Sequence, residues 1–257
     1  MIELNKITKI YNAGLITENC LFRDFSLNVE DGEFVSIVGS NGSGKTSLLN
    51  IICGSIPVEG GQIVIDGNDI TSTPEHTRYS YIGRVYQNTS LGSCPDLTIA
   101  ENMSLADNKG RRYGLSFGLN RRRLGHYREI LSELGLGLEN KLDTQVGTLS
   151  GGQRQALSLL MATMTPIRFL ILDEHTAALD PKTAEKIMEL TDRIVREKKL
   201  TAMMVTHNLR YAVEYGSRML MFHNGGVVLD RKGEEKKATK VEDVLSLFNA
   251  ISIECGN

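Results

Sequence analysis

The most restrictive feature of this sequence is a glycine-rich segment that lies between a strand-like run and a helix-like run. Residues 39–46 read Gly-Ser-Asn-Gly-Ser-Gly-Lys-Thr and match the pattern G-x-x-x-x-G-K-[ST]. The apolar run from Phe34 to Val38 predicts a buried strand, and apolar residues at helical spacing from Leu48 to Ile52 predict a helix that ends near Gly54. Such a loop can wrap its backbone amides around a phosphate group, and the helix N-terminus adds positive potential. The order strand, loop, helix therefore predicts an α/β fold with a phosphate site.

Strand and helix patterns alternate along the rest of the chain. Residues 2–38 predict strands that begin an antiparallel sheet, and the apolar run 169–172 predicts a central parallel strand. The runs 202–205 and 219–222 predict two more buried strands, followed by a hairpin turn at Asn224-Gly225. Because ligands of open α/β sheets bind at the carboxyl ends of the strands, we expect the site there.

Four predicted helices begin with a capping signature. Residues 98–101 (Thr-x-x-Glu) open a helical stretch over about 98–134, which we expect to form a separate lobe. Residues 150–153 (Ser-x-x-Gln) open an apolar helix, and Asp-Pro at 180–181 predicts a third helix start. Residues 239–242 (Thr-x-x-Glu) predict the cap of a final short helix.

The composition excludes several classes of protein. With 29 Lys and Arg against 31 Asp and Glu in 257 residues, the net charge of -2 argues against a dedicated nucleic-acid binder. We expect neither a membrane span nor a secretion signal, because no apolar run is long enough and the N-terminal residues already carry charges. The four cysteines are scattered without metal-ligand or disulfide spacing, so reduced thiols are expected.

Two adjacent acidic residues end the predicted strand 169–172. Consecutive side chains on a strand point to opposite faces, so Asp173 and Glu174 can have different roles. Asp173 suits the shell of a metal ion, and Glu174 suits the group that orients and deprotonates an attacking water. Alone, such a pair is more often a solvated strand end, but a phosphate loop in the same chain favours the chemical interpretation.

A second anion site is predicted at residues 149–153, which read Leu-Ser-Gly-Gly-Gln. A helix that begins at Ser150 and two glycines offers bare amides, a hydroxyl and a positive dipole end to an anion. One chain thus contains two helix ends of this kind, although a single small nucleotide does not obviously need both.

Together these residues resemble the nucleotide-binding subunits of ATP-binding cassette (ABC) proteins, over nearly the whole chain. The motifs occur in the family's order: Walker A at 39–46, the Q-loop at Gln87, the signature at 149–153, Walker B at 169–174, the D-loop at 178–180 and the switch histidine at His207. The resemblance implies a P-loop NTPase fold of the ABC type with an antiparallel β subdomain, a RecA-like core and a helical subdomain. It further implies a single domain over residues 1–257, with the helical subdomain inserted at about 97–165.

In this family two cassettes meet head to tail, so the resemblance implies a homodimer with ATP and Mg²⁺ between the Walker A of one copy and the signature of the other. The catalytic residues that it implies are Glu174, His207, Gln87 and Lys45. The metal ligands that it implies are Thr46, Gln87 and Asp173. The nucleotide contacts that it implies are Tyr11, Gly39, Ser40, Asn41, Gly42, Ser43, Gly44, Lys45, Thr46, Ser47, Gln87, Ser150, Gly151, Gly152, Gln153 and Asp180.

Some of these residues keep alternative interpretations. His175 stands where the family usually has proline, and it either perturbs Glu174 or merely fills space. Residues 157–161 replace the family's frequent Ala-Arg-Ala segment, which puts a local salt bridge in doubt. Tyr11 either stacks on adenine or simply packs. A block of arginines is either a solvated face or a docking surface for a membrane subunit, and it comprises Arg111, Arg112, Arg121, Arg122, Arg123 and Arg128.

The resemblance implies an ATPase at the cytoplasmic face of the cell membrane that powers a transporter whose permease subunits are separate polypeptides. Residues 172–183 resemble bacterial importer cassettes that work with a substrate-binding lipoprotein and a branched-chain-amino-acid-like permease. We therefore expect an importer of a small solute such as an amino acid. An exporter or lipoprotein-release ATPase shares every motif, and a soluble non-transport ATPase of an assembly complex is the third interpretation.

Overall fold

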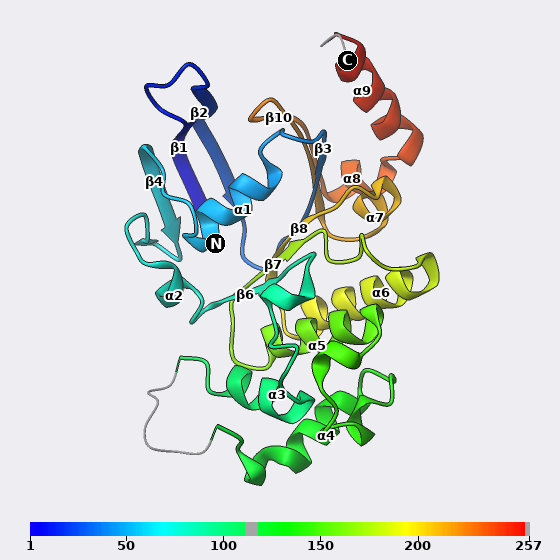
Figure 1. Cartoon of the computed structure of the whole chain (residues 1–257). Helices are drawn as coiled ribbons and strands as arrows, with labels where there is room; N and C mark the ends of the chain where they lie inside the picture. The colour runs from blue at the N-terminus through cyan, green and yellow to red at the C-terminus, as the bar shows by residue number, and fades with distance from the viewer. Residues whose placement is uncertain (111–117, 255–257) are drawn as a thin grey trace. The chain divides into compact units, whose positions relative to one another are not determined.

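The computed structural model describes residues 1–110 and 118–254, and the chain forms two compact units (Figure 1). The first unit comprises residues 1–78 and 199–257, and the second comprises residues 79–198. The assignment of residues 1–257 to a single domain, with a helical subdomain at about 97–165, stays a prediction.

The first unit contains an antiparallel sheet in the order β2-β1-β4-β5. Its strands are β1 (Ile2–Tyr11), β2 (Asn19–Val29), β4 (Gly60–Ile65) and β5 (Asn68–Asp69). Ile2 pairs with Val29 on one side and with Ile65 on the other, and all three side chains are buried. Apolar residues that alternate with polar ones therefore face one core, as the period of a half-buried strand requires. The expected antiparallel start is confirmed.

The first unit also contains a mixed sheet around the strand that leads into the phosphate loop. This strand, β3 (Phe34–Gly39), is parallel to β8 (Thr201–Val205) and β9 (Arg218–His223), while β10 (Gly226–Lys232) is antiparallel to β9. Every residue of β3 is buried, which explains its continuous apolar run. Asn224 and Gly225 both have positive φ, 44° and 74°, so the predicted hairpin turn is confirmed.

Five helices are described in the first unit: α1 (Lys45–Cys53), α2 (Glu75–Arg78), α7 (Leu209–Glu214), α8 (Gly233–Ala238) and α9 (Val241–Glu254). Helix α1 ends at Gly54, as predicted, and Gly54 adopts the left-handed conformation. Its last carbonyls are also bound by the buried Arg78, whose Nη1 donates to Ile51 O at 2.9 Å and Ile52 O at 3.0 Å. These bonds hold the C-terminal end of α1 in place.

The predicted cap of the last helix is wrong. Thr239 lies at the C-terminus of α8, and its hydroxyl donates to Glu235 O at 2.7 Å instead of capping the next helix. The nearby carbonyl competes for the same hydroxyl group. Helix α9 begins at Val241, where Lys240 N donates to Asp243 Oδ2 at 3.3 Å, and the helix has 14 residues and is not short.

The second unit combines a parallel strand pair, β6 (Ile82–Val85) and β7 (Phe169–Asp173), with four α-helices among its described residues. These are α3 (Ile99–Asp107), α4 (Leu124–Ser132), α5 (Gly151–Thr163) and α6 (Pro181–Glu197). Short 3₁₀ turns also occur: η1 (Thr89–Leu91), η2 (Arg121–Arg123), η3 (Leu138–Asn140) and η4 (Val146–Thr148). The two predicted capping boxes are formed at Thr98 and Ser150, and Asp180 caps α6 with proline in its first turn.

The helical part of the second unit has its own apolar core. Met103 from α3, Tyr127 from α4 and Leu157 from α5 are completely buried and belong to one cluster. Helices α3 and α4, which lie in the predicted stretch 98–134, therefore share an apolar core with helix α5.

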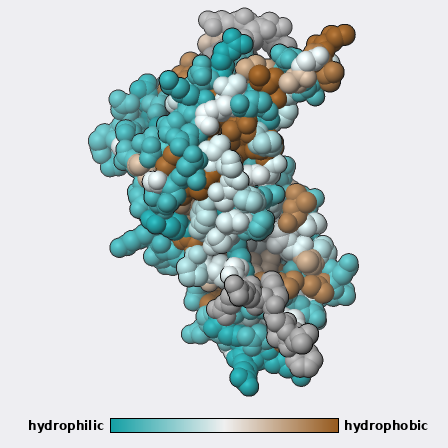
Figure 2. Space-filling model, turned by 90° about the vertical axis from the view of Figure 1, so that its left-hand side faces the viewer, coloured by the Kyte–Doolittle hydropathy of each residue, from teal (hydrophilic) through white to brown (hydrophobic). Residues whose placement is uncertain are grey.

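The surface is mainly hydrophilic on the face shown in Figure 2, where hydrophobic residues appear in separate patches. Among residues 1–110 and 118–254, no helix combines the length and the apolar character that crossing a membrane requires.

Candidate functional site

The phosphate loop follows β3 and requires glycine at two of its positions. A Cβ atom on Gly39, whose φ is 150°, would lie 2.2 Å from the carbonyl oxygen of Phe222 on β9. Gly44, at the start of α1, has a φ of 105°, and a Cβ atom there would lie 2.9 Å from the Phe22 ring. Close packing against the sheet and a left-handed backbone therefore both select glycine.

The inside of this loop has the donors that a phosphate group needs. Lys45 is buried, and its Nζ donates to Gly39 O at 2.9 Å and Ser40 O at 2.8 Å, so the ammonium group lies within the curl of the loop. The Ser43 hydroxyl is buried and has no hydrogen-bond partner within the described part of the chain. Asn41, Gly42 and Thr46 are exposed. A buried cation, an orphaned hydroxyl and an open rim fit a phosphate group.

Tyr11 is tied to the first turn of the helix that follows the loop. It ends β1, and its hydroxyl donates to Ser47 Oγ at 3.1 Å. Lys9 Nζ lies 5.2 Å from the centroid of its ring and pairs with Glu59 at 2.7 Å. These contacts hold a half-buried aromatic ring beside the loop, as stacking on a base requires.

His207 follows β8 at the same sheet edge as the phosphate loop. Val205 at the end of β8 pairs with Ile37 of β3, two residues before Gly39, and the strands are parallel. His207 is exposed, and the next residue, Asn208, caps α7 by accepting from Tyr211 N at 3.3 Å. The first unit thus brings Tyr11, the phosphate loop and His207 to one region, and their roles there stay predictions.

The second unit brings Gln87, Asp173 and Glu174 to one edge. The parallel strands β6 and β7 pair Val85 with Leu172, so Gln87 and the acidic pair lie at the carboxyl ends of neighbouring strands. Asp173 Oδ2 accepts from Arg84 Nη2 at 3.1 Å. Carboxylate and amide oxygens suit Mg²⁺.

Glu174 adopts a backbone conformation that is rare for its residue type. Its φ is 47°, in the left-handed region, which costs a non-glycine residue about 1–3 kcal/mol. The surrounding strand end and turn maintain this conformation, and the half-buried side chain belongs to the residue expected to act as the base. Strain of this kind is concentrated at functional sites.

His175 points into the protein. It is 2% exposed, and its Nε2 lies 3.1 Å from Thr191 Oγ1 on α6. The Thr191 hydroxyl already donates to Ile187 O at 2.7 Å, so the histidine Nε2 must be the donor. This placement supports the space-filling interpretation of His175. Burial lowers the pKa of His175 from 6.5 to about 4.

We expect this buried histidine to make folding stability fall with acidification. Below pH 6.5 the unfolded chain binds a proton at His175, whereas the folded protein does so only near pH 4, so stability is lost as the pH falls through this window. The loss is about 3 kcal/mol in the free energy of unfolding. Urea unfolding of wild type and His175→Gln between pH 7 and pH 4 measures it as the pH-dependent part of their difference.

The matched control for this experiment is His126→Gln, because the His126 side chain is 42% exposed. This variant is expected to keep the wild-type pH dependence. A His175→Gln variant whose stability follows the wild-type curve throughout would contradict the prediction.

The predicted signature forms the start of α5 and packs closely against the start of α6. Ser150 is the exposed N-cap, and its hydroxyl accepts from Gln153 N at 3.3 Å. A Cβ atom on Gly152 would lie 2.3 Å from Thr183 Cγ2, and Thr183 N donates to Asp180 Oδ1 at 3.1 Å. The second unit therefore brings the signature and Asp180 together.

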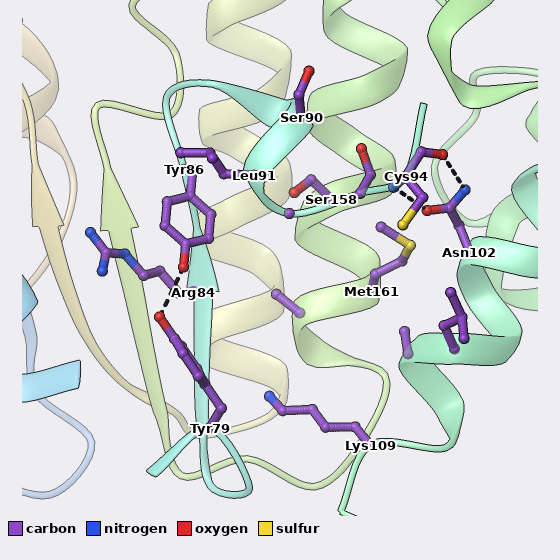
Figure 3. Close-up of a pocket in the computed structure, with 15 residues that line it drawn as sticks. Tyr79, Arg84, Tyr86, Ser90, Leu91, Cys94, Asn102, Lys109, Ser158 and Met161 are labelled. Carbon is purple, nitrogen blue, oxygen red and sulfur yellow. Dashed lines mark hydrogen bonds between the residues drawn. The ribbon is translucent and has the colours of Figure 1, made fainter. Parts of the chain in front are cut away.

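A cavity of about 480 Å³ beside the Q-loop was not predicted from the sequence (Figure 3). The cavity lies between β6, η1, α3 and α5. Asn102 holds the loop around Cys94 by accepting from Cys94 N at 2.8 Å and donating to Cys94 O at 3.0 Å. On the opposite side of the cavity, the Tyr79 and Tyr86 hydroxyls are hydrogen-bonded to each other at 2.8 Å. The only sequence signal was a polar residue, Asn102, on the buried face of a predicted helix.

One described member of the arginine block is bound within the helical lobe. Arg123 Nε and Nη2 donate to the two oxygens of Asp107, at 2.8 Å and 3.0 Å. Asp107 also accepts from the buried Tyr127 hydroxyl at 3.1 Å, so Arg123 serves the lobe itself. The exposed members are Arg121, Arg122 and Arg128. Two predicted members, Arg111 and Arg112, lie outside the described residues.

Comparison with known proteins identifies relatives over nearly the full length. The profile of the family described as "ABC transporter" matches residues 22–177. A "Tyrosine transport ATP-binding protein" of Clostridioides difficile (strain R20291) is 48% identical over 248 residues, covering 96% of this chain and 98% of the relative. A "Thiamine import ATP-binding protein ThiQ" of Shigella flexneri serotype 5b (strain 8401) is 33% identical, covering 91% and 93% of the two chains.

Among solved structures, the dimeric post-hydrolysis state of the ATP-binding cassette MJ0796, bound to ADP and Pi, is similar with a TM-score of 0.77. It is 31% identical and covers 90% of this chain and 98% of its own. The expected α/β P-loop fold of the cassette type, with an antiparallel sheet, a mixed sheet and helices, is confirmed.

Proposed function

The chain belongs to the ABC transporter family, as the ATP-hydrolysing cassette subunit of a transporter, and from this premise we propose that it drives the import of an amino acid. The observation that carries the proposal is the 48% identity over 96% of the chain with a protein named for tyrosine transport. A second relative is named for thiamine import, which supports the inward direction.

We assign the phosphate cradle of this ATPase to the predicted loop. Lys45 and the loop amides bind the β- and γ-phosphates, and Ser43 offers them a buried hydroxyl. Tyr11 supports the adenine. Thr46, Gln87 and Asp173 offer the oxygen ligands that suit Mg²⁺, which when bound neutralises phosphate charge.

The chemical step needs a water molecule that is oriented and deprotonated. Glu174 takes this proton, because it is the carboxylate that follows the expected metal ligand at the end of β7. His207 contacts the γ-phosphate from the end of β8. Both side chains orient reacting groups from strand ends and do not bind them covalently.

We further propose that two copies of the chain form a dimer that shares its nucleotides. Ser150, Gly151 and Gly152 of one copy then bind the γ-phosphate held by the loop of the other. The N-terminus of α5 supports this, because its N-cap Ser150 is exposed and its amides and dipole end attract an anion. The similar cassette MJ0796 is described as a dimer. Only the ATP-bound dimer gains this bridge, so binding and hydrolysis change the dimer contact.

The partners that we propose are separate transmembrane permease subunits and an extracytoplasmic substrate-binding protein, with the cassette at the cytoplasmic face of the membrane. The cavity beside the Q-loop and the exposed arginines of the helical lobe are the surfaces we assign to the permease. Both lie in the second unit, which also carries Gln87.

Purification of the tagged chain from its own cells in mild detergent tests this function. A multi-span permease is expected to accompany it, and a substrate-binding protein found with that permease is expected to bind tyrosine. Co-purification of soluble assembly factors alone would contradict the proposal. A permease whose binding protein ignores amino acids would contradict the cargo but not the transport function.

A further inference from the structure

Arg84 is a buried cation beside the residue expected to hold magnesium. It lies on β6, next to β7, which ends at Asp173, and its Nη2 donates to Asp173 Oδ2 at 3.1 Å. The two side chains are 5% and 13% exposed. The proposed ATPase chemistry does not use this arginine, although its side chain also lines the cavity beside the Q-loop.

The guanidinium group is also held from a second direction. Its central carbon lies 4.5 Å from the centroid of the Tyr86 ring, and the Tyr86 hydroxyl is bonded to that of Tyr79 at 2.8 Å (Figure 3). Stacking on an aromatic face restricts the planar guanidinium group more than it would a lysine ammonium group. Arg84 is thus a pre-organised donor and not a mobile surface charge.

A buried ion pair gains little net stability, because removing two charges from water offsets their attraction. The ion pair has a larger effect on the orientation of the carboxylate than on stability. A bond to one oxygen restricts rotation of the carboxylate plane, and that rotation decides where the other oxygen points. Partners that orient metal ligands in this way commonly change metal affinity by about 10- to 100-fold.

Resting on the proposed assignment of Asp173 to Mg²⁺, we propose that Arg84 is a positioning residue that fixes the Asp173 carboxylate for the metal. Arg84 does not contact the nucleotide phosphates in this role. Its loss removes one bond that orients the partly buried Asp173 carboxylate, and so weakens metal binding without weakening the phosphate cradle.

The test compares wild type, Arg84→Met and Asp173→Asn, each loaded with one equivalent of the non-hydrolysable nucleotide AMP-PNP. Mn²⁺ affinity is measured from the electron paramagnetic resonance signal of free Mn²⁺, and AMP-PNP affinity is measured separately in EDTA. Arg84→Met is expected to bind Mn²⁺ at least about tenfold more weakly, with unchanged AMP-PNP affinity in EDTA. If this variant does not fold, Arg84→Leu, which also lacks an N–H donor, replaces it with the same expected loss.

The control is Arg123→Met, which removes another arginine–aspartate ion pair, to Asp107, from the same unit. It is expected to keep the wild-type Mn²⁺ affinity, and an equal loss there would overturn the proposal by showing a general effect. Wild-type Mn²⁺ affinity in Arg84→Met, together with a loss in Asp173→Asn, would overturn the role of Arg84 alone. Wild-type affinity in Asp173→Asn would overturn the assignment of Asp173 itself.

Discussion

Glu174→Gln is expected to bind ATP normally and to hydrolyse it at least about a hundredfold more slowly, the usual loss when a general base is removed. Glutamine keeps the size and hydrogen-bonding shape of the side chain but cannot accept a proton from water at neutral pH. Steady-state phosphate release at saturating ATP and Mg²⁺ measures the rate, and equilibrium binding of a fluorescent ATP analogue measures the affinity.

The matched control for this variant is Glu189→Gln, an exposed glutamate of α6. Its turnover is expected to equal that of wild type. Near-normal turnover in Glu174→Gln would refute the assignment of the base. The substitution leaves the backbone at residue 174, where φ is 47°, with a side chain of the same size.

Lys45→Ala is expected to weaken ATP binding by about 10- to 100-fold, the range for losing a hydrogen bond to a charged group. The Lys45 ammonium group lies inside the loop, bonded to two of its carbonyls, so its removal takes away both the charge and the clamp on the loop. Isothermal titration with ATP measures the affinity. Lys182→Ala, at an exposed position of α6, serves as the control, and an unchanged affinity in Lys45→Ala would disprove the phosphate cradle.

The same variant tests whether two copies share each nucleotide. Lys45→Ala and Ser150→Arg each disable a different half of the shared site, so their mixture forms one intact site per heterodimer. Partial ATPase activity is therefore expected from the mixture and not from either variant alone. If the mixture stays as inactive as its components, the shared arrangement is disfavoured.

The features predicted correctly from the sequence depend on residues close together in the chain. The capping boxes at Thr98 and Ser150 and the turn at Asn224-Gly225 each bond within four residues, so local patterns suffice. The prediction at Thr239 failed because two local arrangements compete for its hydroxyl group. The hydroxyl donates to the Glu235 carbonyl oxygen in the preceding helix and does not cap the helix that follows.

The motif residues of the site could also be predicted by position, because each motif is a short contiguous segment at the end of a predicted strand or the start of a helix. Their surroundings could not. Asp173 is hydrogen-bonded to Arg84, which is 89 residues away in the sequence. His175 is hydrogen-bonded to Thr191, which is 16 residues away in the sequence. Neither arginine nor threonine carries a signal that marks such a partner in advance.

The sequence by itself thus determined the phosphate loop, the capped helix starts and the identities of the acidic, amide and histidine side chains at strand ends. Only the tertiary structure decided that Arg84 donates to one of those acids, that His175 turns inward and that Asn102 lines a cavity near Gln87. The physical reason is that a hydrogen bond is sensitive to tenths of an ångström. The register of β6 on β7 and the packing of the helices around them, not spacing along the chain, set such distances.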